Sequence, residues 1–289
     1  MRLRGYLNIS GAALFWGSSA TAAKFLFEHS ISPLLVVESR VIIAAILLTG
    51  GFLLGNRRIL RVKFSDLRDL FLLGVIGVVG ANYTYYAAIQ ETSVAIAILM
   101  QYTAPAIVAA YMVLSKQEKI SRVKIYAISM SLAGCAILLG VFSNDVHITA
   151  LGFFFGILSA FCFAFFNVFN KIASKNYSVW TALVYTLISA AVFWLLLDVF
   201  INAHIRIASS QELVTLTIFS IMSVLIPYYF YFSGLKILLP STAIVVSTLE
   251  PVIAITTAFV ILGESLHWTQ VIGGFFVIAA VILLEANKE

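Results

Sequence analysis

Residues 94–118 (VAIAILMQYTAPAIVAAYMVLSKQE) and residues 240–264 (PSTAIVVSTLEPVIAITTAFVILGE) repeat one pattern at a distance of 146 positions. Each copy is apolar almost throughout, has a proline near its middle and ends on a glutamate. These matched residues are Pro105 and Pro251, and Glu118 and Glu264. The same register continues without a gap from Leu70 to Leu139. The chain is therefore predicted to be an internal duplication.

The composition is that of a membrane protein. Of its 289 residues, 62% are hydrophobic and only 11% are charged, whereas about a quarter of a soluble domain is charged. Apolar runs of about 20 residues, long enough to cross a bilayer core as a helix, recur along the whole sequence. Lipid offers no hydrogen-bond partners to an open backbone, so the predicted fold class is an all-α integral membrane protein. The ten predicted transmembrane helices are 5–27, 33–55, 67–89, 94–115, 123–142, 150–172, 178–200, 212–235, 240–262 and 267–286.

The ten helices divide into two repeats. Residues 1–142 are predicted to form the first five-helix repeat, and residues 150–289 the second, within one membrane unit. Because five crossings are an odd number, the second repeat must enter the membrane from the opposite side. Inverted repeats of this kind typically enclose one central site that is exposed to each side in turn. A shift of 147 residues aligns the first helices and places Lys24 on Lys171, one near each membrane face.

Basic residues set the predicted orientation. With the N-terminus in the cytoplasm, about fifteen Lys and Arg residues lie on the cytoplasmic side and only Arg206 lies on the other, which is a strong positive-inside bias. Both termini are therefore expected in the cytoplasm, at a bacterial-type inner membrane. This distribution explains the net charge of +5 without a nucleic-acid partner. Arg2 and Arg4 precede an apolar run that is too long for a signal peptide, so cleavage is not expected.

Glu250 is the strongest candidate for chemistry inside the membrane. It lies near the middle of span 240–262, where a charged acid costs about 2.5–3.5 kcal/mol on insertion scales. A cation, a water-filled cavity or a bound proton must offset that cost. Pro251 removes one backbone donor and frees a carbonyl one turn earlier. Glu250 is predicted to bind solute and to exchange a proton; the alternative left open is a hydrogen bond to a neighbouring helix that only stabilises the bundle.

Aromatic and amide side chains form a second group of candidates. Two sets match under the shift of 146: Asn82, Tyr83, Tyr85 and Tyr86 in the first half, and Tyr228, Tyr229, Tyr231 and Phe232 in the second. Such residues cradle an amphipathic solute by stacking and cation–π contact, although an interfacial aromatic belt or ordinary packing is the alternative. Gln101 and Asn167 are amides that must be paired when buried. The predicted substrate-binding residues are Trp16, Asn82, Tyr83, Tyr86, Gln101, Asn167, Tyr228 and Glu250.

A third group is predicted to be structural or to act in gating: Lys24, Arg40, Pro105, Lys171 and Pro251. A lysine near the end of a membrane helix extends its ammonium group to the interface, which is the favoured role of Lys24 and Lys171 over carboxylate binding. Glu38 lies two residues before Arg40, and residues two apart on a helix do not face each other. Arg40 is therefore expected to tie its helix to a neighbour, with direct solute binding as the alternative.

Two further repeated features are expected to be structural. Glu118 and Glu264 lie in short loops, where capping the start of the next helix is favoured over a gating role. Small residues inside the spans are typical of close helix packing. These residues are Gly74, Gly77, Gly80, Gly152, Gly156, Gly273 and Gly274.

The order and spacing of these motifs resemble the EamA-type carriers of the drug/metabolite transporter superfamily over nearly the whole chain. The residues that carry the resemblance are Trp16-Gly17, Ser32-Pro33 with Arg40, Leu249-Glu250-Pro251 and Gly263-Glu264-Ser265-Leu266. The first half departs from the family pattern at Gln117, where glycine often precedes the glutamate, and at Ala104, which lacks the acid that Glu250 supplies. The resemblance implies transport of small metabolites, since amino-acid and drug exporters are among the family's members.

The expected function is that of a secondary transporter and not of an enzyme. We expect an exporter of amino acids or similar small amphipathic metabolites that works by alternating access, with proton coupling through Glu250. An importer or exchanger of another metabolite, such as a nucleotide, a sugar phosphate or a drug, is the alternative, and a membrane-embedded enzyme is disfavoured because no nucleophile–base arrangement is visible. Cys135 and Cys162 form no metal motif. No metal or other cofactor is expected, and the sequence does not define the oligomeric state.

Overall fold

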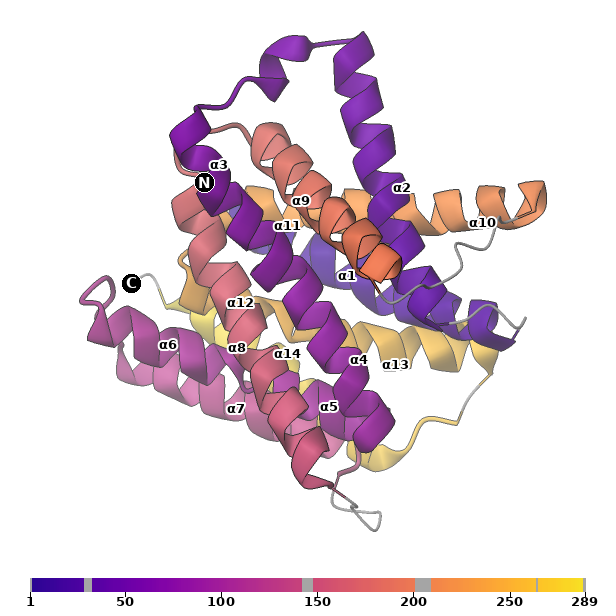
Figure 1. Cartoon of the computed structure of the whole chain (residues 1–289). Coiled ribbons are helices and arrows are strands. Elements are labelled where there is room, and N and C mark those ends of the chain that lie inside the picture. Colours follow the sequence, from indigo (N-terminus) through magenta and orange to yellow (C-terminus); the bar gives the residue numbers. More distant parts are fainter. Residues whose placement is uncertain (1, 29–32, 142–147, 201–208, 264, 288–289) are drawn as a thin grey trace.

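The computed structural model describes residues 2–28, 33–141, 148–200, 209–263 and 265–287, and every regular element in these ranges is helical. Seven helices within these ranges are long and apolar enough to cross a membrane. The expectation of an all-helical membrane fold is confirmed. Both ends of the chain lie toward the same side of the bundle (Figure 1). We call the membrane face that carries them the terminal face, and the other the opposite face.

The first half makes five crossings. The first two are α1 (Arg2–Glu28) and α2 (Pro33–Leu54), and a short 3₁₀ helix, η1 (Arg57–Leu60), follows. The third crossing is built from α3 (Phe64–Leu72), η2 (Leu73–Gly80) and α4 (Ala81–Glu91). The fourth consists of α5 (Val94–Gln101) and α6 (Ala104–Leu114), and the fifth is α7 (Arg122–Leu138).

The second half repeats this order. Its first two crossings are α8 (Ala150–Ala173) and α9 (Val179–Phe200). The third consists of α10 (Ser210–Ser220), η3 (Ile221–Leu225) and α11 (Ile226–Leu235). The fourth consists of α12 (Pro240–Ser247) and α13 (Leu249–Leu262), and the fifth is α14 (Trp268–Ala286). The two halves therefore share not only their number of crossings but also the places where a crossing is interrupted.

The two halves pack against each other in one helical bundle and do not form separate domains. Helix α1 of the first half packs against α11, α12 and α13 of the second, and α8 of the second half packs against α4, α5 and α6 of the first. Figure 1 shows α4, α5 and α8 side by side in the lower part of the bundle. The two final helices, α7 and α14, also pack on each other. The first helix of each half thus packs on the third and fourth crossings of the other half, so the two halves make equivalent contacts, as an inverted pair requires.

The fourth crossing of each half is broken in its middle. Helix α5 ends at Gln101 and α6 starts at Ala104 with a proline at its second position, whereas α12 ends at Ser247 and α13 starts at Leu249. A proline has no N–H, so the backbone carbonyl four residues earlier loses its helical partner. Pro105 thereby frees the carbonyl of Gln101, and Pro251 frees that of Ser247. Both breaks lie inside the bundle and expose polar backbone groups there.

The third crossing of each half contains a wide helical turn. The π-helical segment η2 spans residues 73–80, and η3 spans residues 221–225, which match residues 75–79 under the shift of 146. Glycines allow neighbouring helices to approach η2. A Cβ atom on Gly74 would lie 2.5 Å from the backbone oxygen of Thr186 in α9, and one on Gly77 would lie 3.1 Å from Phe166 in α8. The expected close packing at glycines is confirmed at these positions.

Candidate functional site

A cavity of about 210 Å³ lies in the middle of the bundle and is lined by residues of both halves. The polar and charged side chains in its wall are Ser19, Arg40, Asn82, Gln101, Tyr102 and Glu250. The aromatic side chains in its wall are Trp16, Tyr85, Tyr86, Phe163, Phe166, Phe219 and Tyr228. A largely apolar and aromatic wall with a few convergent polar groups is the usual form of a binding site for a small molecule.

The cavity extends toward the opposite face. Its lining reaches Ala23, close to the end of α1, and Val36, close to the start of α2. Toward the terminal face the lining stops at Phe166 and Tyr228, each about two helical turns before the end of its helix. The structure therefore has a central cavity whose approach from the terminal face is closed.

Buried groups fill the space between the cavity and the terminal face. All eight residues of α12 are buried. Next to α12, Asn167 is fully buried and accepts a 2.6 Å hydrogen bond from the hydroxyl of Tyr231, while its own amide donates to the carbonyl of Phe163 at 2.8 Å. Because every polar atom in this asparagine–tyrosine pair is matched within the protein, the pair has a structural role in the closed side.

Glu250 lies in the first turn of α13 and faces the cavity at the second helix break. The hydroxyl of Tyr102 donates to Oε2 of Glu250 at 2.9 Å, and it lies 3.4 Å from the backbone oxygen of Ser247, the carbonyl that Pro251 frees. Tyr102 is the residue that follows α5, at the first helix break. One side chain therefore links the two breaks and holds the carboxylate in the cavity wall.

Arg40 is the cationic group of the cavity. Its guanidinium donates to Oδ1 of Asn82 at 2.8 Å, and the amide of Asn82 donates to the carbonyl of Val78 in the wide turn η2 at 2.7 Å. Arg40 thus ties α2 to α4, as the sequence predicts. Its Nε atom is buried without a hydrogen-bond partner among the described residues. A buried donor without a partner is costly, so a carboxylate or another acceptor in the cavity gains a strong hydrogen bond there.

Packed rings form the aromatic part of the wall. The ring of Trp16 meets Tyr228 edge-on at a centroid distance of 5.4 Å, and it also lies 5.0 Å from Tyr231. Phe166 lies 5.8 Å from Tyr228 and completes this group from α8. These contacts fix the rings of α1, α8 and α11 against one another, which leaves their free faces as a firm apolar surface for a solute.

The structure gathers six of the eight predicted substrate-binding residues around one cavity: Trp16, Asn82, Tyr86, Gln101, Tyr228 and Glu250. The other two, Tyr83 and Asn167, are not among the residues that line it. Tyr83 is 49% exposed and packs beside Trp194 at 6.5 Å, on the outside of the bundle, because successive helical residues point in different directions. Asn167 is bonded within the closed side, as described above.

The residues predicted to be structural or gating fall in different places. Arg40 and Pro251 line the cavity, whereas Pro105 is buried in α6 outside its lining. Lys171 donates to the backbone carbonyl of Leu238, between α11 and α12. The side chain of Lys24 lies outside the described residues. Tyr102, which sequence analysis missed, is the residue that joins the two halves at Glu250.

The chain shows no sign of a metal centre in the part that the structure describes. No three His, Cys, Asp or Glu side chains in these ranges are placed to hold a metal ion. Cys135 and Cys162 are separate buried thiols. The chemistry available in the cavity is therefore that of charged, amide, hydroxyl and aromatic side chains of the protein itself.

Comparison with known proteins gives a consistent result for both halves. The family model described as "EamA-like transporter family" matches residues 3–140 and again residues 150–285. An uncharacterised inner membrane transporter of Salmonella typhimurium, YicL, is 25% identical over 293 residues, with 99% of this chain and 96% of the relative covered.

Two further similarities extend the same result. An uncharacterised transporter of Clostridium kluyveri is 24% identical over 302 residues, which covers 99% of this chain and 94% of the relative. A protein of known crystal structure, 17% identical in sequence, superposes with a TM-score of 0.83 over 99% of this chain and 98% of its own. That likeness establishes the shared fold.

Proposed function

We propose that this chain, which belongs to the EamA-like transporter family, is a secondary carrier that exports amino acids or similar small amphipathic metabolites by alternating access. The observation that carries the proposal is the central cavity, in which a guanidinium group, a carboxylate and a wall of aromatic rings converge. Arg40 recognises the carboxylate of a zwitterion, Glu250 recognises its ammonium group, and the rings hold its apolar part. The volume of about 210 Å³ limits the solute in this state to a small molecule.

Proton coupling through Glu250 is supported by its surroundings. A carboxylate inside the membrane is expensive unless it is paired, solvated or protonated. A tyrosine hydroxyl both donates and accepts hydrogen bonds, so Tyr102 is able to donate to the charged carboxylate and to accept from the protonated acid. Glu250 therefore changes its protonation state without losing this partner.

The proposed location is a bacterial inner membrane with both termini in the cytoplasm. The excess of basic residues on the terminal face supports this orientation, as does the inner-membrane relative from Salmonella. The cavity of this structure then faces the outside of the cell, and the closed side faces the cytoplasm. This conformation corresponds to the outward-facing state of an alternating-access cycle.

Reconstitution into liposomes tests the proposal. The purified protein is supplied with labelled amino acids and, in parallel, with labelled nucleotides, sugar phosphates and cationic drugs. Uptake is measured over time, with and without an imposed pH gradient. Transport of an amino acid that grows with the gradient supports the proposal. Transport of only nucleotides, sugar phosphates or cationic drugs in the same vesicles would replace the proposed solute class by the alternative one.

Removal of the Tyr102 hydroxyl is expected to weaken transport strongly. The variant Tyr102→Phe keeps the ring and loses the 2.9 Å bond to Glu250, and a hydrogen bond to a charged group contributes about 1.5–3 kcal/mol. We expect initial rates to fall by about tenfold to 100-fold. The matched control is Tyr111→Phe, since Tyr111 is 47% exposed on the outside of the bundle. Equal rates for both variants would exclude a role for the hydroxyl.

Two tyrosines in the third crossings of the two halves are expected to differ in effect. Tyr228→Leu removes a ring from the cavity wall and its edge contact with Trp16, and such aromatic contacts contribute about 0.5–1.5 kcal/mol. The apparent KM should therefore rise by about threefold to tenfold. Tyr83→Leu alters only the outer surface and should leave the KM unchanged. A larger effect at Tyr83 than at Tyr228 would contradict the placement of the site.

A further inference from the structure

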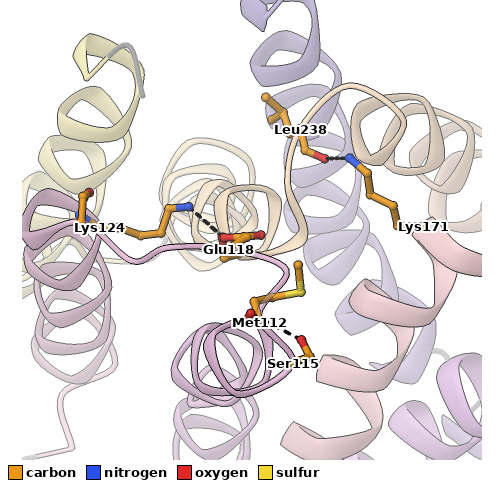
Figure 2. A network of polar contacts seen from close by, with 8 residues as sticks. Met112, Ser115, Glu118, Lys124, Lys171 and Leu238 are labelled. Atoms are coloured by element: carbon orange, nitrogen blue, oxygen red, sulfur yellow. Dashed lines mark hydrogen bonds and ion pairs between the residues drawn. The ribbon is translucent and has the colours of Figure 1, made fainter.

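The closed side of the bundle contains a buried ionic network that joins the two halves. Nζ of Lys124 donates to Oε2 of Glu118 at 3.0 Å and to Oγ of Ser241 at 3.0 Å, and the Ser241 hydroxyl donates to the same carboxylate oxygen of Glu118. Figure 2 shows the carboxylate of Glu118 and the ammonium group of Lys124 pointing toward each other in this network. Glu118 and Lys124 belong to the first half, whereas Ser241 belongs to α12 of the second.

Local structure places Glu118 in this network. Lys116 has a left-handed backbone conformation, with a φ of 57°, which reverses the chain after α6. The N–H groups of Gln117 and Glu118 then both donate to the carbonyl of Met112, at 2.9 and 3.0 Å, and so cap the end of α6. The expected helix-capping role of Glu118 is wrong, because the side chain of Ser121 caps α7 instead.

The network is buried, and both hydrogen bonds to Glu118 go to its Oε2 atom, while Oε1 has no hydrogen-bond partner among the described residues. Glu118 is 8% exposed, Lys124 is 9% exposed and Ser241 is fully buried. Ser241 is the second residue of α12, so the carboxylate of Glu118 also lies near the positive end of that helix dipole. Breaking a buried pair by removing one partner is costly, because the other charge is left without compensation. The first half therefore holds the start of α12 firmly in place.

The duplication predicts where a matching network would have to lie. Under the shift of 146, Glu118 matches Glu264, Lys124 matches Gln270 and Ser241 matches Ala95. The opposite face thus has no lysine and no serine at the matching positions. Gln270 is already engaged, since its Oε1 accepts the backbone N–H of His267 at 2.9 Å. The same network is therefore not available on that side.

We infer that Glu118, Lys124 and Ser241 form a latch, specific to the terminal face, that favours the state of the carrier open to the opposite face. The inference rests on the proposed alternating-access function. Inverted repeats change state by exchanging their conformations, so opening the terminal side requires α12 to leave the first half as α5 closes the opposite side. The latch stabilises the state that is open to the opposite face. No equivalent network stabilises the state that is open to the terminal face.

Cysteine labelling measures the latch without a substrate. Gln101 lines the present cavity and matches Ser247, which is fully buried, so Ser247 is expected to line the cavity when the terminal side opens. The reporter is Ser247→Cys in a chain in which Cys135 and Cys162 are replaced by alanine. The labelling rate with a water-soluble maleimide is measured in nanodiscs, where both faces are accessible. A second reporter, Gln101→Cys in the same background, follows the side that is now open.

Loss of the latch is expected to change the two reporters in opposite directions. Glu118→Gln should raise the labelling rate at position 247 by about tenfold and lower the rate at position 101. Ser241→Ala removes one hydrogen bond and no charge, so it should raise the labelling rate at position 247 by only about threefold. The double variant Glu118→Gln with Lys124→Gln leaves no unpaired charge and should label as fast as Glu118→Gln. Asp69→Asn removes an acid from the same membrane face outside the network and should change neither rate.

Three outcomes would overturn the latch. Unchanged labelling in Glu118→Gln and in Ser241→Ala, in protein with normal thermal stability, excludes it. A parallel rise at positions 247 and 101 indicates loosening of the whole bundle and also excludes it. A rise in Glu118→Gln that disappears in the double variant assigns the effect to an unpaired charge. Labelling needs no solute, so the latch can be tested even if no solute is transported in liposomes. If transport is observed but the latch variants label like the unaltered protein, the proposed function stands and the latch is excluded.

Discussion

Replacement of Glu250 by glutamine is expected to lower transport by about 100-fold and to remove its dependence on the pH gradient. The amide retains the size of the side chain and one acceptor oxygen for Tyr102, but it carries no charge and exchanges no proton. Truncating one partner of a buried charged pair costs about 2–5 kcal/mol, and the ammonium group of the solute loses such a partner. Initial rates in proteoliposomes, with and without an imposed pH gradient, provide the measurement.

A second carboxylate supplies the control for this result. Glu285→Gln removes a charge from an exposed position in α14, outside the cavity, and should transport like the unaltered protein. If Glu250→Gln kept both its rate and its pH profile, the carboxylate would have a purely structural role. If it kept counterflow exchange of solute but lost accumulation driven by the gradient, Glu250 would serve coupling and not binding.

Replacement of Gly17 by alanine is expected to destabilise the protein and to disrupt the cavity wall. A Cβ atom at this position would lie 2.6 Å from the backbone oxygen of Glu250 and 2.9 Å from the backbone nitrogen of Ala254. Backbone atoms cannot rotate away, so α1 and α13 must separate, and overpacking of this kind costs about 1–3 kcal/mol. The shift also displaces Trp16 and Glu250 relative to each other, so transport should be lost together with stability.

Thermal unfolding in detergent and transport in liposomes measure the two effects of Gly17→Ala. We expect the midpoint of unfolding to fall by several degrees, since about 1 kcal/mol corresponds to about 2–4 °C in a chain of this order of size. The matched control is Gly50→Ala in α2, where a Cβ atom would meet no heavy atom within 4 Å and alanine is the better helix former. Equal midpoints for the two variants would mean that α1 and α13 are less closely packed than described.

Sequence patterns captured the features of the fold that depend on repetition. The matched prolines Pro105 and Pro251 located the broken fourth crossing of each half, and the charge of Glu250 within an apolar span marked the cavity. These inferences succeed because a membrane penalises an unpaired charge or an open backbone wherever it occurs. The positions that carry such a penalty can be recognised from the amino-acid sequence alone.

The directions in which side chains point from their helices were harder to predict. Asn82, Tyr85 and Tyr86 are spaced by three and four residues, so they share one helical face. Tyr83 is also three residues from Tyr86, so the spacing alone did not exclude it; its 49% exposure and its absence from the cavity lining do. Tyr102 gave no such signal, because its partner Glu250 is 148 positions away and the two meet only where the helix breaks face each other.

Glu118 illustrates a second limit. Its position in a loop before a helix favoured capping, which is a local interaction. Its side-chain contact with Lys124 is local and could have been inferred, since the two are six residues apart. Its contact with Ser241 is 123 positions distant and depends on how the inverted halves pack. A network that joins two repeats therefore becomes visible only when both are folded together.

The wide turns η2 and η3 have a consequence for the ancestry of the chain. A π turn contains one residue more than an α turn, and it occurs at the equivalent place in both repeats. One insertion before the gene doubled explains both more simply than two later events. The bulge then belonged to the half-length sequence from which both repeats derive.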